Sequence, residues 1–375
     1  MKKFIFGAGH DARYVVANAF LAKNEEYDGV IVSSKEDNPD RLYFLTVYSV
    51  EEAVNKFGRN IEVTLGVSKQ YKDAVKEILC DHGITNVVEP DRFSLRFNDY
   101  PDVSMTDYLQ AWFFAVTGKM LDWENLRTYD EKIQWLKIFD CTDKKRDLAD
   151  KYKVREFIKE KIGDKYLIPI YGTWKHFRDI EFDTLPQSFV LKCNHGSGWN
   201  EIVYDKKNID MDDLNSKFES WLRCDYADTP GLELQYKGID PLIIAEKLLE
   251  DDSGDVRDYK FFVFDGQVKM IQVDINRLSN HKRNIYTPEW EYIPVSIHYP
   301  SAPEVVVERP KCLSKMIEIA ETLGEGFIHV RVDLYLVNGN IFFGEMTFTH
   351  GNGIEVFNPE EFGLKMGNWI KIPNQ

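Results

Sequence analysis

In residues 1–100, short apolar segments alternate with segments of helical spacing. Residues 4–6, 30–32 and 61–67 have the apolar character of strands, and residues 12–22 have the spacing of an amphipathic helix. Ser49 and Glu52 form a capping-box pattern at the start of the next helix, 49–57. Parallel strands need helical crossovers between them, so this alternation predicts a Rossmann-like α/β domain with a parallel sheet over residues 1–100.

The pattern changes after residue 100. Residues 101–145 are helical in spacing and rich in aromatic side chains, which predicts a helical connector, and a further helix is expected over 148–161. Asp265-Gly266 and Asn338-Gly339 each separate two apolar runs and predict tight hairpin turns. We therefore expect an α+β domain with antiparallel hairpins over 146–375. Its predicted strands are 189–193, 201–204, 242–248, 259–264, 269–274, 327–336 and 341–346, with helices at 211–226 and 310–322.

Composition and charge exclude several classes of protein. A chain of 375 residues with 43% hydrophobic and 29% charged residues is long enough for two or three globular domains. Its formal net charge of −15 repels phosphate backbones, so we expect no nucleic-acid partner. The five cysteines are scattered and form no CxxC pair, which is typical of reduced thiols in a cytoplasmic protein. We expect no transmembrane segment, because no apolar run reaches about 18 residues.

The first candidate for chemistry is a lysine at the end of the strand 189–193. Lys192 precedes a loop that contains His195, Gly196, Ser197 and Gly198. A lysine provides a point charge for a phosphate oxygen, and glycines allow backbone N–H groups to approach phosphates closely. The pattern therefore indicates a phosphate-binding loop. A plain hairpin turn is the alternative interpretation.

The second candidate is a pair of acids on the last predicted hairpin. Side chains alternate along a strand, so Arg331 and Asp333 share one face, and Glu345 lies on the returning strand. Two converging carboxylates repel each other unless a cation lies between them, and Mg²⁺ prefers such oxygen ligands. A solvent-exposed hairpin face is the alternative interpretation.

A third candidate is the end of the strand 242–248. Glu246, Lys247 and Leu248 could present backbone groups to an adenine edge, with a following acid, Glu250 or Asp251, on ribose hydroxyls. An ordinary strand end is the alternative interpretation.

In this order along the chain, the motifs resemble those of the ATP-grasp superfamily. The resemblance runs from about residue 121 to residue 369, and it is closest to the TupA-like ATP-grasp proteins of bacterial surface-polysaccharide and teichuronopeptide synthesis. It rests on residues 128–136, 150–155, 258–260, 331–335 and 343–348, together with the Lys192 loop. It implies two α+β subdomains that clasp ATP, with a lid over about 190–247, and ATP and Mg²⁺ as cofactors.

The resemblance also implies a role for each matching residue. Lys151 and Lys192 would hold the ATP phosphates under the loop 194–200, and Glu246, Lys247 and Leu248 would meet the adenine. Arg331 would stabilise the oxyanion of a tetrahedral intermediate. The other implied roles are ribose binding by Glu250 or Asp251, positive charge near the transferred phosphate or acyl substrate from Lys260 and Arg277, and Mg²⁺ binding by Asp333 and Glu345. Thr347 stands where many ATP-grasp ligases have an asparagine ligand, so the number of metal ions stays open, and His350 and Asn352 lie near enough in sequence to supplement the site.

The predicted function is an ATP-dependent carboxylate–amine ligase that works through an acyl phosphate. Its substrates would be an amine and a small-molecule or glycan-precursor carboxylate in surface-polysaccharide synthesis. An ATP-grasp phosphotransferase, a non-catalytic nucleotide-binding scaffold and a glycosyltransferase are the alternatives. Gly7, Gly9 and Ala12 also match G-x-G-x-x-A, a dinucleotide-type turn, but the second strand lacks the ribose-binding acid. The first domain could instead bind a nucleotide-sugar or carrier, or merely pack against the ligase.

Overall fold

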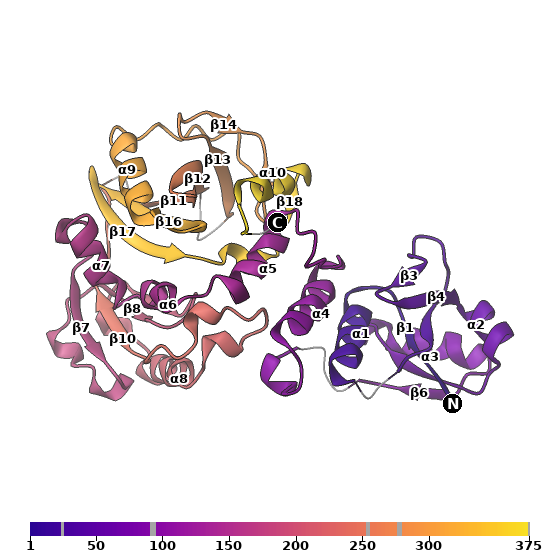
Figure 1. The fold of residues 1–375 in the computed structure, drawn as a ribbon. Coiled ribbons are helices and arrows are strands. Elements are labelled where there is room, and N and C mark those ends of the chain that lie inside the picture. The colour runs from indigo at the N-terminus through magenta and orange to yellow at the C-terminus, as the bar shows by residue number, and fades with distance from the viewer. Residues whose placement is uncertain (24–25, 91–94, 253–255, 276–279, 374–375) are drawn as a thin grey trace. The chain divides into compact units, whose positions relative to one another are not determined.

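The protein is described by a computed structural model that covers residues 1–23, 26–90, 95–252, 256–275 and 280–373. The chain forms two compact units. The first unit contains Met1–Trp123 and Asp228–Leu232, and the second contains Glu124–Ala227 and Glu233–Gln375 (Figure 1). In the described ranges, no helix combines the length and the apolar character needed to cross a membrane.

The first unit is built on one six-stranded sheet in the order β3-β4-β2-β1-β5-β6. Every pair is parallel except β3–β4, so the predicted parallel α/β sheet is confirmed. The predicted capping box is confirmed as well, because the Ser49 side chain accepts from the Glu52 N–H and the Glu52 side chain accepts from the Ser49 N–H. The elements are β1 Lys2–Phe6, α1 His10–Ala22, β2 Gly29–Val32, β3 Arg41–Leu42, β4 Leu45–Ser49, α2 Val50–Phe57, β5 Ile61–Leu65, α3 Lys72–Asp81, β6 Asn86–Val88 and α4 Met105–Thr117.

The second unit contains two main antiparallel sheets. The four-stranded sheet has the order β7-β10-β8-β9, and the six-stranded sheet has the order β14-β13-β12-β11-β16-β17. The strands are β7 Ile170–Trp174, β8 Phe189–Cys193, β9 Asn200–Val203, β10 Ile243–Glu246, β11 Arg257–Phe264, β12 Gln267–Ile275, β13 Lys282–Tyr286, β14 Tyr292–Ile293, β15 Ser296–Ile297, β16 His329–Val337, β17 Asn340–Thr347 and β18 Phe357–Asn358. The helices are α5 Tyr129–Phe139, α6 Asp143–Ala149, α7 Val154–Lys161, α8 Met211–Leu222, α9 Leu313–Gly324 and α10 Glu361–Trp369, with short 3₁₀ turns that include η8 Leu234–Tyr236 and η9 His350–Gly353.

Both predicted hairpin turns are present in the six-stranded sheet. Asp265 and Gly266 join β11 to β12 with φ of 49° and 74°, and Asn338 and Gly339 join β16 to β17 with φ of 48° and 78°. Two successive positive φ angles are the signature of the type I′ turn, whose twist matches that of the flanking strands. The turn chemistry therefore fixes which strands pair around the polar residues of this sheet.

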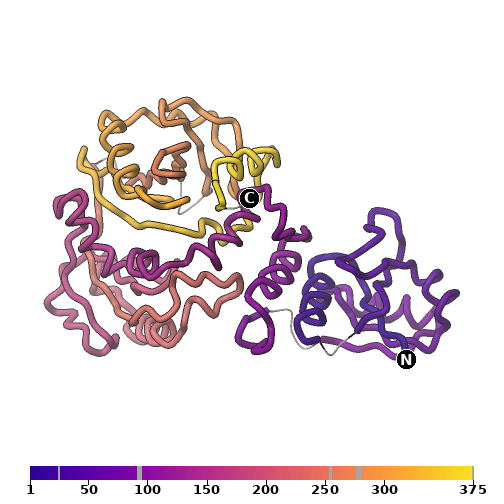
Figure 2. Tube along the Cα trace, viewed as in Figure 1, coloured from indigo at the N-terminus to yellow at the C-terminus, as the bar shows by residue number. Residues whose placement is uncertain are grey.

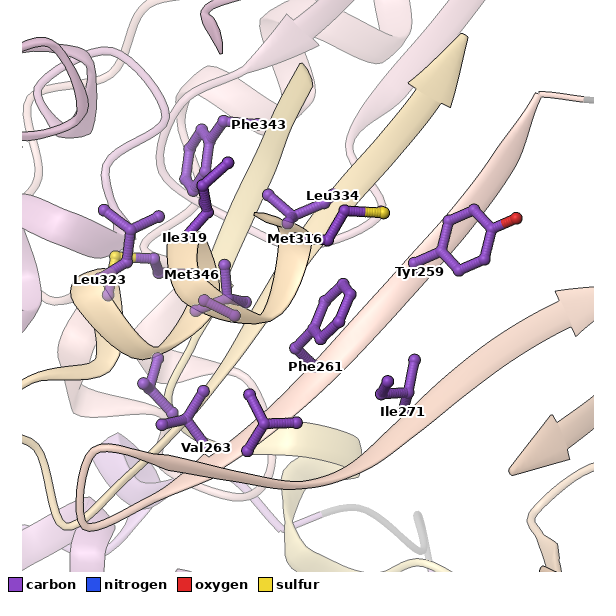
Figure 3. Close-up of a cluster of buried hydrophobic side chains, with 14 of the residues drawn as sticks. Tyr259, Phe261, Val263, Ile271, Met316, Ile319, Leu323, Leu334, Phe343 and Met346 are labelled. Carbon is purple, nitrogen blue, oxygen red and sulfur yellow. The ribbon is translucent and has the colours of Figure 1, made fainter. Parts of the chain in front are cut away.

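The two faces of the six-stranded sheet differ in character because side chains alternate along β11 and β16. Phe261, Val263 and Leu334 point to one face and pack against Met316 and Ile319 of α9 (Figure 3). Burying such side chains contributes about 1.5–3 kcal/mol each. The opposite face carries the polar set Asp258, Lys260, Arg331 and Asp333.

The prediction of one helix over 148–161 is wrong at its start. Helix α6 ends at Ala149 and α7 begins only at Val154. The cause is Asp150, whose Oδ1 accepts hydrogen bonds from the N–H groups of Tyr152 (2.8 Å) and Lys153 (3.2 Å). A side-chain acceptor of this kind satisfies the free donors at a helix start, so the chain breaks and begins a new helix. Lys151 lies in the break.

Other boundaries and elements also differ from the expectation. The helix expected over 211–226 ends at Leu222. The patterns gave no sign of β7, β13 and α10. The last of these returns the C-terminal segment to α5, as the chain trace shows, and Lys132 of α5 donates to the Ile370 carbonyl at 2.9 Å (Figure 2).

Candidate functional site

Lys192 lies on the four-stranded sheet and faces Glu246. Leu191 and Cys193 point into the apolar core beneath α8, so alternation directs Lys192 to the other face. Strands β8 and β10 are antiparallel, and the Lys192 Nζ lies 2.6 Å from Glu246 Oε2. The two side chains are 16% and 10% exposed, so this is a mostly buried ion pair.

Lys151 is held against the loop that follows β8. Its N–H donates to the Asn194 carbonyl at 3.1 Å, and its Nζ donates to the Gly196 carbonyl. Asn194 is fully buried, and its amide bonds Asp150 Oδ1 at 3.0 Å and the Leu242 N–H at 2.7 Å. Asn194 therefore ties the helix break, the loop and the start of β10 together. The sequence placed it in the loop but gave no sign of this role.

The charge of Lys151 is influenced by both sheets. Burial lowers the pKa of its ammonium group, Glu345 opposes that shift, and Lys192 adds to it. Glu345 lies on β17 of the six-stranded sheet and Lys192 on β8 of the four-stranded sheet. The two lysines and this acid are therefore close enough to interact electrostatically.

A narrow cleft lies between the two sheets. Its charged lining consists of Lys151, Arg155, Lys192 and Glu246. The apolar lining comes from both sheets and from the α7 region: Val154, Leu167, Ile168, Ile170, Ile244 and Phe343, with Gly344. A cleft with apolar walls and a few converging cations suits a ligand that has a flat apolar part and an anionic part, such as a nucleotide. Sequence reasoning missed Arg155, which also donates to the Ile168 carbonyl at 3.0 Å.

A bulge at Gly344 directs neighbouring side chains of β17 to different faces. Glu345 pairs with Asp333 and Phe343 pairs with Leu334, so Gly344 is an extra residue between two consecutive pairs. In a regular strand without the bulge, Phe343 and Glu345 would share a face, because side chains alternate. The bulge instead places Phe343 in the apolar core and Glu345 opposite Asp333. A Cβ at position 344 would lie only 3.1 Å from the Asp333 carbonyl oxygen, which accounts for the glycine.

Arg331 connects both predicted metal acids. Its Nε and Nη2 donate to the two oxygens of Asp333 at 2.7 Å each, and Nη2 also donates to Glu345 Oε1 at 2.8 Å. Its Nη1 lies 2.5 Å from His350 Nδ1. Burial acts to lower the pKa of Arg331, but Asp333 and Glu345 outweigh it, so the guanidinium stays charged. A cation does lie between the two acids, as charge repulsion requires, and here it is Arg331.

Lys260 completes this polar face. Its Nζ donates to Asp333 Oδ2 at 2.8 Å and to Asp258. Burial alone would raise the pKa of Asp333, but Arg331 and Lys260 outweigh it and hold that pKa at about 2. Asp258 was not recognised from the sequence as a site residue, although its spacing of two from Lys260 on one strand could have indicated it.

The two acids differ in how accessible they are to a metal ion. Glu345 keeps 35% of its side chain exposed, whereas Asp333 keeps 3%. Thr347 lies opposite Arg331, on the same face as Glu345. Among the residues described, no three or more His, Cys, Asp or Glu side chains gather into a metal site. Mg²⁺ needs only one or two protein carboxylates when waters and phosphates complete its shell, so the half-exposed Glu345 fits that ion, whereas Asp333 would first have to give up a bond to Arg331 or Lys260.

Several predicted residues lie elsewhere. His195 is buried beneath α8, with Nε2 3.1 Å from the Trp221 carbonyl, and Ser197 and Gly198 are exposed in the loop. The Lys247 N–H donates to the Pro169 carbonyl, and Asp251 Oδ2 accepts from the Asn338 N–H at 2.7 Å. In the described part of the chain, the cleft lining contains none of His195, Ser197, Gly198, Lys247, Leu248 and Asp251. Arg277 lies outside the described residues.

The G-x-G-x-x-A motif of the first unit has a packing role. Gly7 has φ of 107°, and a Cβ there would lie 2.8 Å from the Gly66 carbonyl oxygen. A Cβ on Gly66 would lie 2.7 Å from the Cα of Ala12. The small residues therefore let α1 pack closely on the sheet, and Asp11 accepts from the Ser68 hydroxyl at the start of that helix.

Comparison with known proteins supports the resemblance found in the sequence. The family model described as TupA-like ATP-grasp matches residues 131–371, which is more than half of the chain. No curated protein sequence matches the chain.

Solved structures of ATP-dependent ligases are also similar. D-alanine–D-alanine ligase from Bacillus anthracis shares 14% identity at a TM-score of 0.34, with 99% of this chain and 96% of that chain covered. The ATP-grasp ligase PsnB, complexed with minimal precursor, Mg and ADP, shares 13% identity at a TM-score of 0.32, with 98% and 96% covered. N5-carboxyaminoimidazole ribonucleotide synthetase from Thermus thermophilus shares 11% identity at 0.30, with 92% and 71% covered.

Proposed function

Because the chain belongs to the TupA-like ATP-grasp family, we propose that it is an ATP-dependent ligase that joins a carboxylate to an amine. ATP would bind in the cleft between the two sheets of the second unit. The carboxylate would be activated as an acyl phosphate and then attacked by the amine. The ligase domain would comprise residues 146–375, with the lid over about 190–247.

One observation carries this proposal: Lys151 and Lys192 line a single cleft, and so does Gly344, the neighbour of Glu345 on β17. The lysines come from the α6–α7 break and from β8, while the acid comes from β17. An ordinary hairpin does not bring together two lysines and an acid from separate elements, whereas a site for a triphosphate and a divalent ion needs such a set. The apolar lining next to Glu246 would accept the adenine.

The residues would act mainly through alignment and charge. Phosphoryl transfer builds negative charge on both the attacking and the leaving oxygen, and fixed cations compensate it without reorganisation. Lys192 would release the Glu246 carboxylate and bind a phosphate oxygen of ATP. Lys151 would bind a second phosphate oxygen. Arg331 would stabilise the oxyanion formed when the amine attacks, with Lys260 keeping Asp333 ionised beside it. Bound Mg²⁺, held by Asp333, Glu345 and Thr347, would supply further charge compensation.

The substrates of this proposal are defined by chemistry. The resemblance to surface-polysaccharide proteins makes carboxylated sugars the first acyl substrates to test, with amino acids and amino sugars as amines. Lys260 and Arg277 would add positive charge for the carboxylate, as the resemblance implies.

A product screen with isotope labelling tests the proposal. ADP release would be measured for pairs of carboxylates and amines with Mg²⁺ and ATP, and mass spectrometry would identify the amide. With an ¹⁸O-labelled carboxylate, an acyl phosphate transfers one ¹⁸O to the released phosphate, which ³¹P NMR detects. We expect labelled phosphate in step with amide.

The other outcomes contradict the proposal in distinct ways. ADP release with the phosphoryl group retained on the product would indicate a phosphotransferase. ATP binding without turnover for every pair, with equal biological function after Asp333→Ala, would indicate a scaffold. The variant Lys217→Met is the matched control, because Lys217 of α8 pairs with Glu201 and Asp213 away from the cleft lining.

A further inference from the structure

Helix α5 carries a motif, residues 128–136, for which the proposed chemistry gives no role. It begins with a capping box in which Thr128 and Glu131 satisfy each other's N–H groups. Two polar side chains of the helix, Gln134 and Lys137, are 0% and 1% exposed. Burying a lysine is costly unless its donors are satisfied, so the partners of these side chains indicate what the helix does.

Both buried side chains bind the chain that follows β17. Lys137 Nζ donates to the Asn352 carbonyl at 2.8 Å and to Gln134 Oε1 at 2.8 Å. Gln134 Nε2 donates to the Gly353 carbonyl at 2.8 Å and lies 3.3 Å from that of Asn352. One turn earlier on the helix, Asp130 Oδ1 accepts from the Glu355 N–H at 3.1 Å. Helix α5 thus holds residues 352–355 at three backbone positions.

The backbone held in this way has an unusual conformation. Gly351, Asn352 and Gly353 have φ of 58°, 55° and 62°, three left-handed residues in succession. Left-handed backbone costs about 1–2 kcal/mol for a residue with a side chain, so it persists only where the surroundings enforce it. A Cβ on Gly353 would lie 2.4 Å from Gln134 Nε2, so a glycine is needed for the loop to reach α5.

The consequence of this conformation is the position of His350, one residue before the left-handed segment. His350 Nδ1 lies 2.5 Å from Arg331 Nη1, and its Nε2 lies 3.3 Å from Glu355 Oε1. A guanidinium can only donate, so Nδ1 accepts and the neutral ring carries its proton on Nε2, facing the carboxylate. The loop that α5 holds therefore places the imidazole between Glu355, which belongs to the held segment, and Arg331 of β16.

The contact with His350 also determines where the remaining N–H of Arg331 lies. Four hydrogen bonds use its Nε, both Nη2 hydrogens and one Nη1 hydrogen. Of the five donors of a guanidinium, one Nη1 hydrogen remains in the described surroundings. It sits on the nitrogen that His350 holds.

We propose that helix α5 is the positioning element of the ligase site, in which Gln134 and Lys137 fix the 350–355 loop so that His350 orients Arg331. This inference rests on the proposed function for the role of Arg331 toward the oxyanion, but the positioning of His350 itself does not. Gln134 and Lys137 are positioning residues and touch no substrate.

The test compares two lysines of the same helix. Lys137→Met removes the donor to the loop, whereas Lys132→Met removes a donor to the Ile370 carbonyl and is the matched control. Gln134→Met is a second variant of the same contact, in case Lys137→Met does not fold. NMR of ¹⁵N-histidine protein reports the His350 tautomer, with the signal assigned by His350→Asn. Thermal unfolding and ATP affinity are measured for every variant.

We expect the wild-type His350 signal to show an acceptor Nδ1 and a protonated Nε2, and to shift in both loop variants but not in Lys132→Met. With a substrate pair from the screen, kcat should fall roughly a hundredfold while the KM for ATP stays unchanged, as for a misplaced catalytic group. Folded loop variants with an unshifted His350 signal would overturn the inference. If no substrate pair gives turnover, the proposed function fails, and the NMR comparison still decides the positioning role.

Discussion

The two sheets of the second unit hold their charges in different ways. On the four-stranded sheet, Lys192 pairs with the Glu246 carboxylate and lines the cleft. On the six-stranded sheet, Arg331 is bound at four points and is almost fully buried. A lysine with one partner can exchange it for a ligand, whereas a guanidinium bound at four points is preorganised. Under the proposed function, Lys192 would capture the ligand and Arg331 would align charge for the reaction.

The largest expected effect of a substitution is on the six-stranded sheet, where Arg331 is preorganised. Asp333→Ala removes the carboxylate shared by Arg331 and Lys260 and leaves two buried cations with fewer partners. Breaking a buried ion pair from one side costs about 3–5 kcal/mol, so we expect that loss in the free energy of unfolding, together with loss of turnover. Urea denaturation and ADP release measure the two effects. A stability equal to that of Glu345→Gln, whose side chain is more exposed, would contradict the distinction between buried and open charges.

The matching change on the cleft side should weaken ATP binding and destabilise the fold less than Asp333→Ala does, because it leaves one mostly buried charge, Glu246, with fewer partners and not two. Lys192→Met removes a charge-assisted hydrogen bond worth about 1.5–3 kcal/mol, so the Kd for ATP should rise roughly tenfold to a hundredfold. Titration with a fluorescent ATP analogue measures it, and Lys217→Met should bind as the wild type does. The proposed difference between the two sheets would be contradicted if Lys192→Met destabilised the fold as much as Asp333→Ala while ATP bound normally.

The contrast also shows how far the sequence could lead. The turns at Asp265-Gly266 and Asn338-Gly339 were predictable because left-handed turn chemistry is local. Alternation then placed Arg331 and Asp333 on one face. The sequence could not show that Arg331 itself lies between the two acids, because the reach of a side chain across a strand pair depends on the bulge at Gly344.

Contacts between distant segments left no local signal at all. Lys137 and Asn352 are 215 positions apart, and nothing near either residue indicates the other. The break at Asp150 was missed for a different reason: a side-chain cap inside a periodic apolar pattern interrupts the helix without changing the pattern. The G-x-G-x-x-A turn shows the reverse case, in which a recognisable motif is explained by close helix–sheet packing.

Acid should destabilise the buried polar face before its carboxylates titrate. His329 of β16 lies between the Tyr129 hydroxyl and the Val263 carbonyl, and burial lowers its pKa to about 3 from 6.5. The unfolded chain then binds a proton that the folded chain refuses, so stability is lost as the pH falls from 6.5 toward 3. The expected loss from this group is about 2 kcal/mol between about pH 6.5 and about pH 5.

Urea unfolding of the wild type and His329→Gln over this pH range measures that loss. The variant should show a pH dependence weaker by up to one proton, since its amide does not titrate. His298→Gln is the control, because the His298 side chain is 56% exposed. Equal pH dependence of the wild type and His329→Gln would show that folding does not lower the pKa of His329.

The smallest effect concerns Asp251, which the sequence assigned to ATP ribose. In the structure Asp251 Oδ2 accepts from the Asn338 N–H at 2.7 Å, at the turn between β16 and β17. If supporting that turn is its main role, Asp251→Ala should lower the free energy of unfolding by about 1 kcal/mol and leave the Kd for ATP unchanged. Glu250→Ala is measured beside it, because the sequence offers the exposed Glu250 as the alternative ribose acid. A ribose role predicts the opposite: Asp251→Ala would weaken ATP binding but not the binding of an analogue without ribose hydroxyls, and Asp251 would then belong with Lys192 among the residues that capture ligand.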